Sequence, residues 1–547
     1  MLDTSVCCKT IRSVPCSSEH GSLRQTSPLL FAFVVSLWVA NILMVSASAE
    51  VLPKTVIVVG AGAASIKLAH TLWKECAHES DRPFKVIILE ANDYVGGRIR
   101  SFCFEGHTVE MGANWISGRE TAFDNPIWKL AKEIQLQGHS SDRDNPERVM
   151  VVNCLNRKDV TSNYLKCVQR FDRIYANAVE QVASESGTVT PSTDQSVRSL
   201  LEKNGWTGKN ELTNLERIVE HNVLEVWVAE HLEQLSGAHD MKAGANDVDL
   251  GQDEMFVEDS RGFNSIFGGM VQDLLVDDAT TILLRHEVKS IHYSPGNVKV
   301  VATNFDTGEP VEYQADMIIS TVSLGVLQSD AIQFVPPLPE WKKEALNEIR
   351  MFNFAKVYAK FRRRLWPEEK DYLVFVSGGE NNRGYYPFWM KYKNTMDNLL
   401  MCYLGGAQAR RVESLDLESI KDEIEALFRS AFGDSGGDDC RPESVEVTDW
   451  SRNRHFHGSY SYFPKGAFGT IPQEDLTRGL SGVDEDKKDH PTTLYFAGEA
   501  FDDKFNGWVQ GGYLSGERTA RQILQDHRPG SNTCKDIQKE KYIPRAP

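Results

Sequence analysis

The 547-residue sequence lacks the excess of basic residues that capture of nucleic acid requires. It holds 60 Lys and Arg against 77 Asp and Glu, a formal net charge of −17. An acidic chain can gather cationic ligands, although acidity alone mainly favours solubility. A composition of 41% hydrophobic and 25% charged residues excludes a disordered, collagen-like or coiled-coil protein. The length predicts about three or four domain-sized units.

Cysteine is also scarce, with ten residues and no Cys-x-x-Cys pair. Cys7, Cys8 and Cys16 precede the body of the chain, which therefore carries an odd number, and at least one thiol there stays free unless it bridges to another chain. His455 and His457 alternate on an expected strand, but two histidines without further ligands indicate a structural role. The sequence therefore predicts no metal site.

The N-terminus contains an uncharged apolar run at residues 29–45, followed by Ser-Ala-Ser-Ala ending at Ala49. A net-positive start, an apolar stretch and small residues predict a secretory signal peptide, cleaved after Ala49. The alternative is a retained membrane anchor, because the run is almost long enough to span a bilayer. The sequence contains no Asn-x-Ser/Thr glycosylation acceptor, so glycosylation gives no support to secretion. We expect residues 1–49 to direct the chain to the secretory pathway, with an extracellular or vacuolar destination.

A nucleotide-binding pattern opens the body of the chain. Residues 55–59 are a β-branched run typical of a buried parallel strand, and Gly60-Ala-Gly-Ala-Ala-Ser65 precedes a helical pattern. Residues 84–89 form a second apolar run that ends in Glu90. This βαβ unit predicts that Gly60 makes the turn and Gly62 lets a pyrophosphate approach, while Glu90 accepts ribose hydroxyl hydrogen bonds.

The residues after Glu90 distinguish between cofactors. Gly96, Gly97 and Arg98 follow the ribose acid, and a nicotinamide enzyme has no need of them there. An arginine that reaches a second stretch of pyrophosphate suits an extended dinucleotide such as FAD. Farther along, residues 125–240 read as helical, and further strands are predicted at 281–284, 288–293, 298–302, 317–320 and 494–497.

Several ordered motifs together resemble the flavin-containing amine oxidases, and within them the plant polyamine oxidases. These motifs are Glu90…Gly96-Gly97-Arg98, Gly112-Ala-Asn-Trp115, Ser323-Leu-Gly-Val-Leu327 and Phe496-Ala-Gly-Glu499. The similarity runs from about Lys54 to Leu524.

The resemblance implies an α/β fold with two domains. A Rossmann-like FAD-binding domain is assembled from residues 54–137, 245–334 and 452–527. A substrate domain, a mixed sheet flanked by helices (α+β), takes residues 138–244 and 335–451. Residues 528–547 are expected to form a loose tail.

The resemblance also assigns residues to FAD. Those that match the family's cofactor positions are Gly60, Gly62, Ala64, Glu90, Gly97, Arg98, Gly112, Ala113, Trp115, Val288, Glu499, Trp508 and Val509. No cysteine lies at the helix start around Val509, so we expect FAD to be held noncovalently.

The implied reaction is oxidation of a polyamine such as spermine, spermidine or an acetyl derivative. A hydride leaves the carbon beside an amine nitrogen for flavin N5, the imine is hydrolysed, and O2 reoxidises the flavin with release of H2O2. Lys356 matches the family's catalytic lysine, although by itself a lysine in a strand pattern usually reaches solvent. Tyr460 and Trp508 match the aromatic pair that flanks the substrate. We expect no nucleic-acid partner and see no evident protein partner.

The chain also departs from the family pattern. Ser117 stands where plant relatives carry a glutamate and animal relatives a histidine, so the substrate contact expected there lacks a charge. Phe354 replaces a tyrosine, and residues 225–230 lack the expected acid and aromatics, for which Glu225, Glu230 or Glu233 are candidate substitutes. An oxidase for another amine, a flavin-dependent lysine demethylase and a catalytically silent FAD-binding protein therefore stay open as alternatives. A nicotinamide dehydrogenase is the weakest alternative, because it leaves Arg98 unexplained.

Overall fold

The structure is a computed structural model of the chain and describes residues 53–527, all within one unit, Pro53–Pro547. The description excludes residues 77–82, 120, 122, 144, 186–189, 191, 229, 247–249, 251–253, 277, 378–382, 394–397, 434–438, 468–472 and 484–490. The predicted leader and the predicted tail lie outside the described residues. Among the helices of the described part, none has the length and apolar character needed to cross a membrane.

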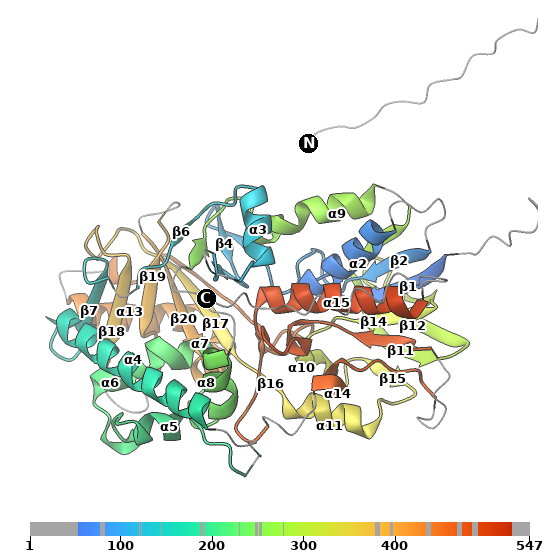
Figure 1. The fold of residues 1–547 in the computed structure, drawn as a ribbon. Coiled ribbons are helices and arrows are strands. Elements are labelled where there is room, and N and C mark those ends of the chain that lie inside the picture. The colour runs from blue at the N-terminus through green and yellow to red at the C-terminus, as the bar shows by residue number, and fades with distance from the viewer. Residues whose placement is uncertain are drawn as a thin grey trace, which may run out of the picture. The chain divides into compact units, whose positions relative to one another are not determined.

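A five-stranded parallel sheet joins strands from distant parts of the chain (Figure 1). Its order is β10-β2-β1-β14-β23, and each neighbouring pair is parallel. The strands are β1 (Lys54–Val59), β2 (Phe84–Leu89), β10 (Thr280–Leu283), β14 (Met317–Ser320) and β23 (Leu494–Phe496). Parallel strands covered on both faces need continuous apolar runs, which is why such runs predicted β1, β2 and β14.

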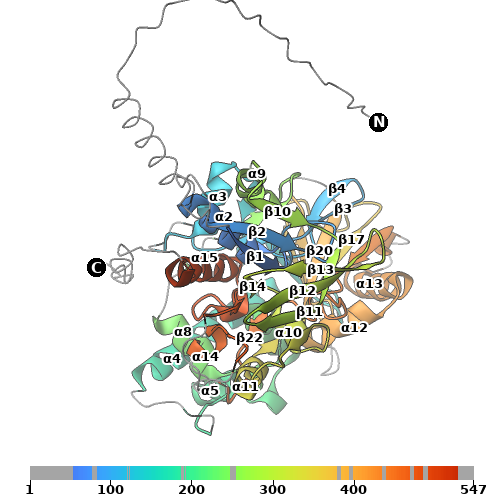
Figure 2. The same ribbon diagram turned by 90° about the vertical axis from the view of Figure 1, so that its right-hand side faces the viewer.

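Helices α2 (Ala63–Glu75) and α15 (Val509–His527) pack against each other beside this sheet (Figures 1 and 2). Their backbones meet at Gly516, where an added Cβ would lie 2.1 Å from the carbonyl oxygen of Ala64. Only glycine permits this contact, and it brings the start of α15 close to the glycine-rich turn before α2. Helix α9 (Gly268–Leu275) also packs on α2.

A seven-stranded mixed sheet forms the second large layer. Its order is β21-β17-β20-β19-β18-β7-β8, antiparallel except where β18 and β7 run parallel. The strands are β7 (Val149–Asn153), β8 (Lys158–Asp159), β17 (Phe354–Lys360), β18 (Tyr372–Val376), β19 (Phe388–Lys391), β20 (Leu399–Gly405) and β21 (Ser444–Val447).

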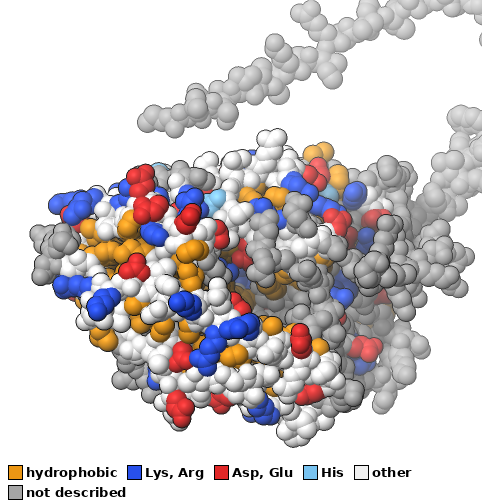
Figure 3. All heavy atoms as spheres, turned by 60° about the vertical axis from the view of Figure 1, so that its left-hand side comes forward, with side chains coloured by type: hydrophobic (Ala, Val, Ile, Leu, Met, Phe, Trp, Pro, Cys, Tyr) orange, Lys and Arg blue, Asp and Glu red, His pale blue; other side chains and the backbone are white. Residues whose placement is uncertain are grey.

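Helices cover both faces of that sheet, as the alternation of side chains requires. Tyr358 and Tyr403 join the core cluster that includes α4 (Thr161–Ser184), whereas Val357 and Leu400 join the cluster that includes α13 (Leu417–Phe432). The described chain is therefore a mixed α/β protein with several sheets. On the face seen in Figure 3, basic and acidic side chains are interspersed, so neither sign gathers into one patch there.

Smaller elements connect these layers. A four-stranded sheet has the order β13 (Pro310–Gln314), β12 (Asn297–Asn304), β11 (His286–Ser294) and β15 (Gln333–Val335). Short pairings join β3 (Ser101–Phe104) to β4 (His107–Glu110), β9 (Met255–Val257) to β5 (Trp115–Ile116) and β6 (Gly138–Ser140), and β16 (Arg350–Met351) to β22 (Ser461–Tyr462). Further helices are α3 (Pro126–Glu133), α5 (Val197–Lys203), α6 (Asn214–Glu220), α7 (Val226–Val228), α8 (Gly237–Asn246), α10 (Leu324–Leu327), α11 (Glu340–Glu348), α12 (Gly406–Ser414) and α14 (Gln473–Thr477).

Two sequence-based expectations were wrong in part. Residues 125–240 contain the expected helices but also β6, β7 and β8, because the helical periodicity of α4 dominates that stretch. His455 and His457 lie in turns rather than on a strand. His457 has a left-handed φ of 51° and Gly458 a φ of 133°, which extended pairing does not accommodate.

Candidate active site

One cavity of about 920 Å³ lies between the two large sheets and is lined by residues from both. Every residue that the resemblance assigned to the cofactor, to catalysis or to the substrate contributes to its wall, although these residues span positions 60 to 509 of the chain. They are Gly60, Gly62, Ala64, Glu90, Gly97, Arg98, Gly112, Ala113, Trp115, Ser117, Val288, Lys356, Tyr460, Glu499, Trp508 and Val509. The structure thus brings the predicted site residues together.

The two glycine motifs contact each other at one end of the cavity. The amide of Gly96 donates to the carbonyl of Ala61 at 2.9 Å, and a Cβ on Gly97 would lie 3.3 Å from the Cα of Gly62. A Cβ built on Gly62, in contrast, meets no described atom within 4 Å. Because Gly62 lines the cavity, this open direction leaves room for a phosphate close to the backbone.

Ser65, at the position of the third glycine of a typical G-x-G-x-x-G turn, is fully buried and makes a compensating bond. Its hydroxyl lies 2.6 Å from Oγ1 of Thr321, which itself donates to the carbonyl of Val59 at 2.8 Å. The substitution therefore ties α2 to the segment after β14.

The carboxylate of Glu90 stands at the end of β2 beside the glycine turn. It accepts hydrogen bonds from the amide of Ala61 at 2.7 Å and from the amide of Asn92 at 2.8 Å. Burial raises the pKa of this carboxyl. His455, which lines the cavity here, has its Nδ1 3.2 Å from Oδ1 of Asn92, a contact that the sequence did not predict.

Two predicted cofactor residues form an ion pair. Nη1 of Arg98 lies 2.8 Å from Oε1 of Glu499 and also donates to the carbonyl of Ser459. The other oxygen of Glu499 accepts from the amide of Gly507 at 2.6 Å and from the hydroxyl of Ser461. Glu499 is buried, so these donors hold its charge in a fixed position.

Lys356 lies on β17 and is only 2% exposed, so the solvent-reaching alternative is wrong. Its Nζ donates to the carbonyl of Glu110 at 2.7 Å, to the carbonyl of Gly112 and to Oδ1 of Asn114. Burial lowers the pKa of Lys356 to about 7 and raises that of Glu110 to about 7. The Gly112 backbone is equally constrained, since a Cβ there would lie 1.7 Å from the carbonyl oxygen of Arg98.

Aromatic rings form the walls near Lys356. Trp115 packs edge-on against Trp227 at 5.4 Å between ring centroids, and Nζ of Lys356 lies 5.7 Å from the Trp115 ring. The hydroxyl of Tyr460 donates to the carbonyl of Trp227 at 2.6 Å. Trp508 is 39% exposed. Trp227 belongs to the 225–230 segment that seemed to lack a lining aromatic; it does line the cavity.

An acid from elsewhere in the chain lies beside Ser117. The hydroxyl of Ser117 donates to Oε1 of Glu254 at 2.8 Å, and both residues line the cavity. Arg143, a further lining residue, lies 3.6 Å from the other Glu254 oxygen. The sequence did not predict Glu254 or Arg143. Both contacts depend on the pairing of two short strands, β5 and β9, and no local sequence pattern reveals that pairing.

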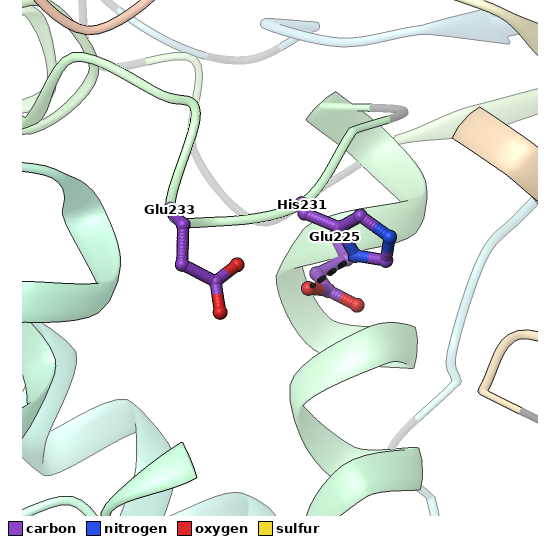
Figure 4. Close-up of side chains that lie close together, drawn as sticks. All are labelled: Glu225, His231 and Glu233. Carbon is purple, nitrogen blue, oxygen red and sulfur yellow. Dashed lines mark ion pairs between the residues drawn. The ribbon is translucent and has the colours of Figure 1, made fainter. Parts of the chain in front are cut away.

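The three acids considered as substitutes lie outside the cavity wall. Figure 4 shows Glu225 and Glu233 close to His231, with their ligand atoms all within 4.8 Å of one another. Arg383 binds Glu225 at 2.6 and 2.8 Å, and Lys209 lies 2.8 Å from Glu233. Because cations already neutralise both carboxylates, this cluster reads as a structural ion-pair network.

A further acid of the cavity wall, Asp240 of α8, faces Tyr175 and Asp194. Among the described residues its buried Oδ2 has no hydrogen-bond partner. Burial, with a smaller contribution from the Asp194 charge, raises the pKa of Asp240 to about 8.

These features fit a long dinucleotide. The glycine turns leave space at Gly62, and the cavity is large enough for a cofactor and part of a substrate. The side-chain amide nitrogen of one lining residue, Nε2 of Gln510, is buried and lacks a partner within the described part of the chain. Buried donors of this kind normally have an acceptor, which a bound ring carbonyl would provide.

Comparison with known proteins decides the family. The family described as flavin containing amine oxidoreductase matches residues 66–524. The chain belongs to this family. Membership makes it an FAD-dependent amine oxidoreductase and confirms the family and the cofactor that the motifs predicted.

The alignments with similar proteins cover most of this chain. Polyamine oxidase 1 of Zea mays is 31% identical over 492 residues, which cover 88% of this chain and 92% of that protein. Polyamine oxidase 6 of Oryza sativa subsp. japonica is 29% identical over 483 residues, 86% of this chain and 90% of that protein. A solved structure of putrescine oxidase bound to putrescine has a TM-score of 0.63 at 19% identity and covers 87% of this chain and 99% of its own, which shows a shared fold.

Proposed function

We propose that this amine oxidoreductase oxidises polyamines, namely spermine, spermidine or their acetyl derivatives, with O2 as the electron acceptor. The observation that carries the proposal is one cavity that joins the glycine turns to an aromatic-walled end holding Lys356. The names of the plant relatives, polyamine oxidases over most of their length, support the same substrate class. When bound, FAD supplies the acceptor for a hydride from the carbon beside an amine nitrogen.

The FAD site in this proposal is a Rossmann-like domain built from residues 54–137, 245–334 and 452–527, with residues 138–244 and 335–451 as substrate domain. The order of the parallel sheet supports it, because β1, β2, β10, β14 and β23 come from all three segments. Gly60, Gly62 and Gly97 would admit the pyrophosphate, and Glu90 would hold the ribose. No cysteine stands at the start of α15, so the cofactor is held noncovalently.

Lys356 acts next to the reacting atoms in this proposal. A pKa of about 7 lets the side chain hold or release a proton near neutral pH, and its three acceptors fix Nζ beside Gly112 and Asn114. Lys356 would position the water that hydrolyses the imine and assist reoxidation by O2. The aromatic walls help in another way, since desolvation lowers the pKa of a bound amine and favours its oxidisable neutral form.

Tyr460 and Trp508 would hold the substrate chain, while Ser117 lies at the wall beside it. Both rings line the cavity, and Gly507 next to Trp508 approaches the Tyr460 ring, where an added Cβ would lie 3.4 Å from Cδ2. Apolar faces with a quadrupole suit a flexible, cationic chain.

The proposed setting of the enzyme is the secretory pathway, extracellular or vacuolar, with residues 1–49 as leader or, alternatively, as membrane anchor. The apolar run at 29–45 and the small residues before Ala49 support it. The partners are the small amine and O2.

Anaerobic mixing of the purified, FAD-loaded enzyme with an amine panel tests the function. Spermine, spermidine, their acetyl forms and a monoamine are compared by the rate of loss of flavin absorbance. Fast bleaching by polyamines supports the proposal. Bleaching by the monoamine alone favours an oxidase for another amine, which Ser117 and the cationic Arg143 in the cavity wall would suit. Bleaching by none of the panel contradicts the proposal.

A further inference from the structure

We propose that Glu254 is the carboxylate that binds a protonated amino group of the substrate, held in place by Ser117. The proposal rests on the proposed function and identifies the group that recognises the substrate charge. Ser117 itself offers no charge to a cationic substrate. In this chain the charge reaches the same part of the wall from a neighbouring strand.

The strand register places the two side chains together. In the antiparallel pairing of β5 with β9, Trp115 pairs with Phe256 and Ile116 with Met255. One step beyond these pairs, Ser117 faces Glu254, and its hydroxyl donates to Oε1 at 2.8 Å. The side-chain amide nitrogen of Asn125 fixes the Ser117 backbone by donating to its carbonyl at 2.6 Å. The serine therefore orients one carboxylate oxygen, Oε1, while the second, Oε2, lies 3.6 Å from Arg143.

Glu254 has the exposure that a binding group needs. Its side chain is 22% exposed and lines the cavity beside Trp115 and Trp227. The other acids of the wall are engaged or biased toward the neutral form. Glu499 pairs with Arg98, and Nζ of Lys289 lies 2.5 Å from Glu287. Burial raises the pKa of Glu90 and raises that of Asp240 to about 8. Aromatic walls screen a charge less than bulk water does, which strengthens the attraction of Glu254 for an ammonium group.

Arg143 is the competing cation. Its guanidinium lies 3.6 Å from Oε2 of Glu254, beyond hydrogen-bond distance, and stacks over the Trp227 ring at 4.3 Å from the centroid. The ring contact gives Arg143 a place to remain when a substrate ammonium takes over Glu254. Removal of Arg143 should therefore tighten polyamine binding. If Arg143 instead bound a carboxylate of the substrate, its removal would not tighten binding.

Binding without turnover provides the test. The holoenzyme reduced with dithionite cannot oxidise an amine, so calorimetric titration with spermidine measures its dissociation constant directly. We expect E254Q to raise this constant about tenfold or more, because one charge-assisted contact is lost. S117A should give a smaller increase, and R143M should lower the constant. E147Q, which removes one charge from an exposed residue outside the cavity, is the matched control and should leave the constant unchanged.

The outcomes separate this inference from the proposed function. If the wild type is bleached by spermidine but E254Q binds spermidine as the wild type does, the Glu254 assignment is wrong and the function stands. If the reduced enzyme binds spermidine through Glu254 but no polyamine bleaches the oxidised enzyme, the proposed function is wrong and the Glu254 assignment stands. Loss of binding in E147Q and E254Q alike would overturn the assignment, since it would reflect net charge rather than a contact. Absorbance at the flavin maximum verifies that each variant retains FAD.

Discussion

The ammonium group of Lys356 donates a hydrogen bond to the side-chain oxygen of Asn114, a residue 242 positions earlier in the chain. The same ammonium contacts the carbonyls of Glu110 and Gly112, so its three donors are directed at one short segment. That segment carries Gly112 and Ala113, which the resemblance assigned to the cofactor. Lys356 thus connects the core of the seven-stranded sheet to the cofactor end of the cavity.

Replacement of Lys356 by methionine should slow turnover by about 100-fold or more while FAD stays bound, because a proton carrier is lost and the packing volume is kept. Burial lowers the pKa of Lys356 and raises that of its neighbour Glu110, so the pair also predicts an inflection near neutral pH in the rate of the wild type, which the variant should alter. Stopped-flow reduction and reoxidation across pH 5.5–9 measure both. Wild-type rates in K356M would show that Lys356 does not take part in the mechanism. A second variant, K356R, tests whether a side chain with a permanent charge can replace one that titrates.

Asn114→Ala should shift that inflection below pH 7. The Asn114 oxygen stabilises the charged form of Lys356. Desolvation already lowers the pKa of this lysine, and without the Asn114 oxygen the pKa should fall further. We expect a moderate loss of rate, smaller than that of K356M, together with the shift. An unchanged pH profile with lower thermal stability would show that Asn114 acts only through packing.

Asp240→Asn should stabilise the protein in a pH-dependent way. The pKa of Asp240 is raised from its ordinary 3.8 to about 8, so between these values the unfolded chain releases a proton that the folded chain keeps. The free energy of unfolding therefore falls as pH rises through this window. Asparagine does not ionise, and the gain in Tm should be larger at pH 8 than at pH 5. Asp124→Asn, at a largely exposed acid, is the control; an equal gain at both pH values would contradict the argument.

Local patterns made much of the fold predictable. Continuous apolar runs identified β1, β2 and β14, and the glycine spacing placed Gly60 and Gly62 in a turn, because both signals depend on neighbouring residues. The resemblance then brought distant residues such as Glu499 into the same site. Contacts set by long-range register were beyond such reasoning: Ser117 and Glu254 are 137 residues apart and meet through two strands of two and three residues.

Burial was the other property that the sequence concealed. The alternation in β17 did not show that Lys356 faces the inside, because a lysine in a strand normally marks the solvent side. Asn114 belongs to the motif Gly112-Ala-Asn-Trp115, and its polar side chain between Ala113 and Trp115 was the available sign that it contacts another polar group.

Alanine substitutions at two glycines should separate cofactor binding from folding. Gly62 has an ordinary φ of −82°, and its Cβ would enter open space in the cavity, so G62A should fold with the Tm of the wild type when both lack FAD. The added methyl group stands where a pyrophosphate would approach the backbone, and FAD affinity should fall about tenfold or more. G112A should instead lower the Tm sharply, since its Cβ would collide with the carbonyl oxygen of Arg98. Thermal melts of the FAD-free proteins and titration with FAD distinguish the two, and tight FAD binding by G62A would place the pyrophosphate elsewhere.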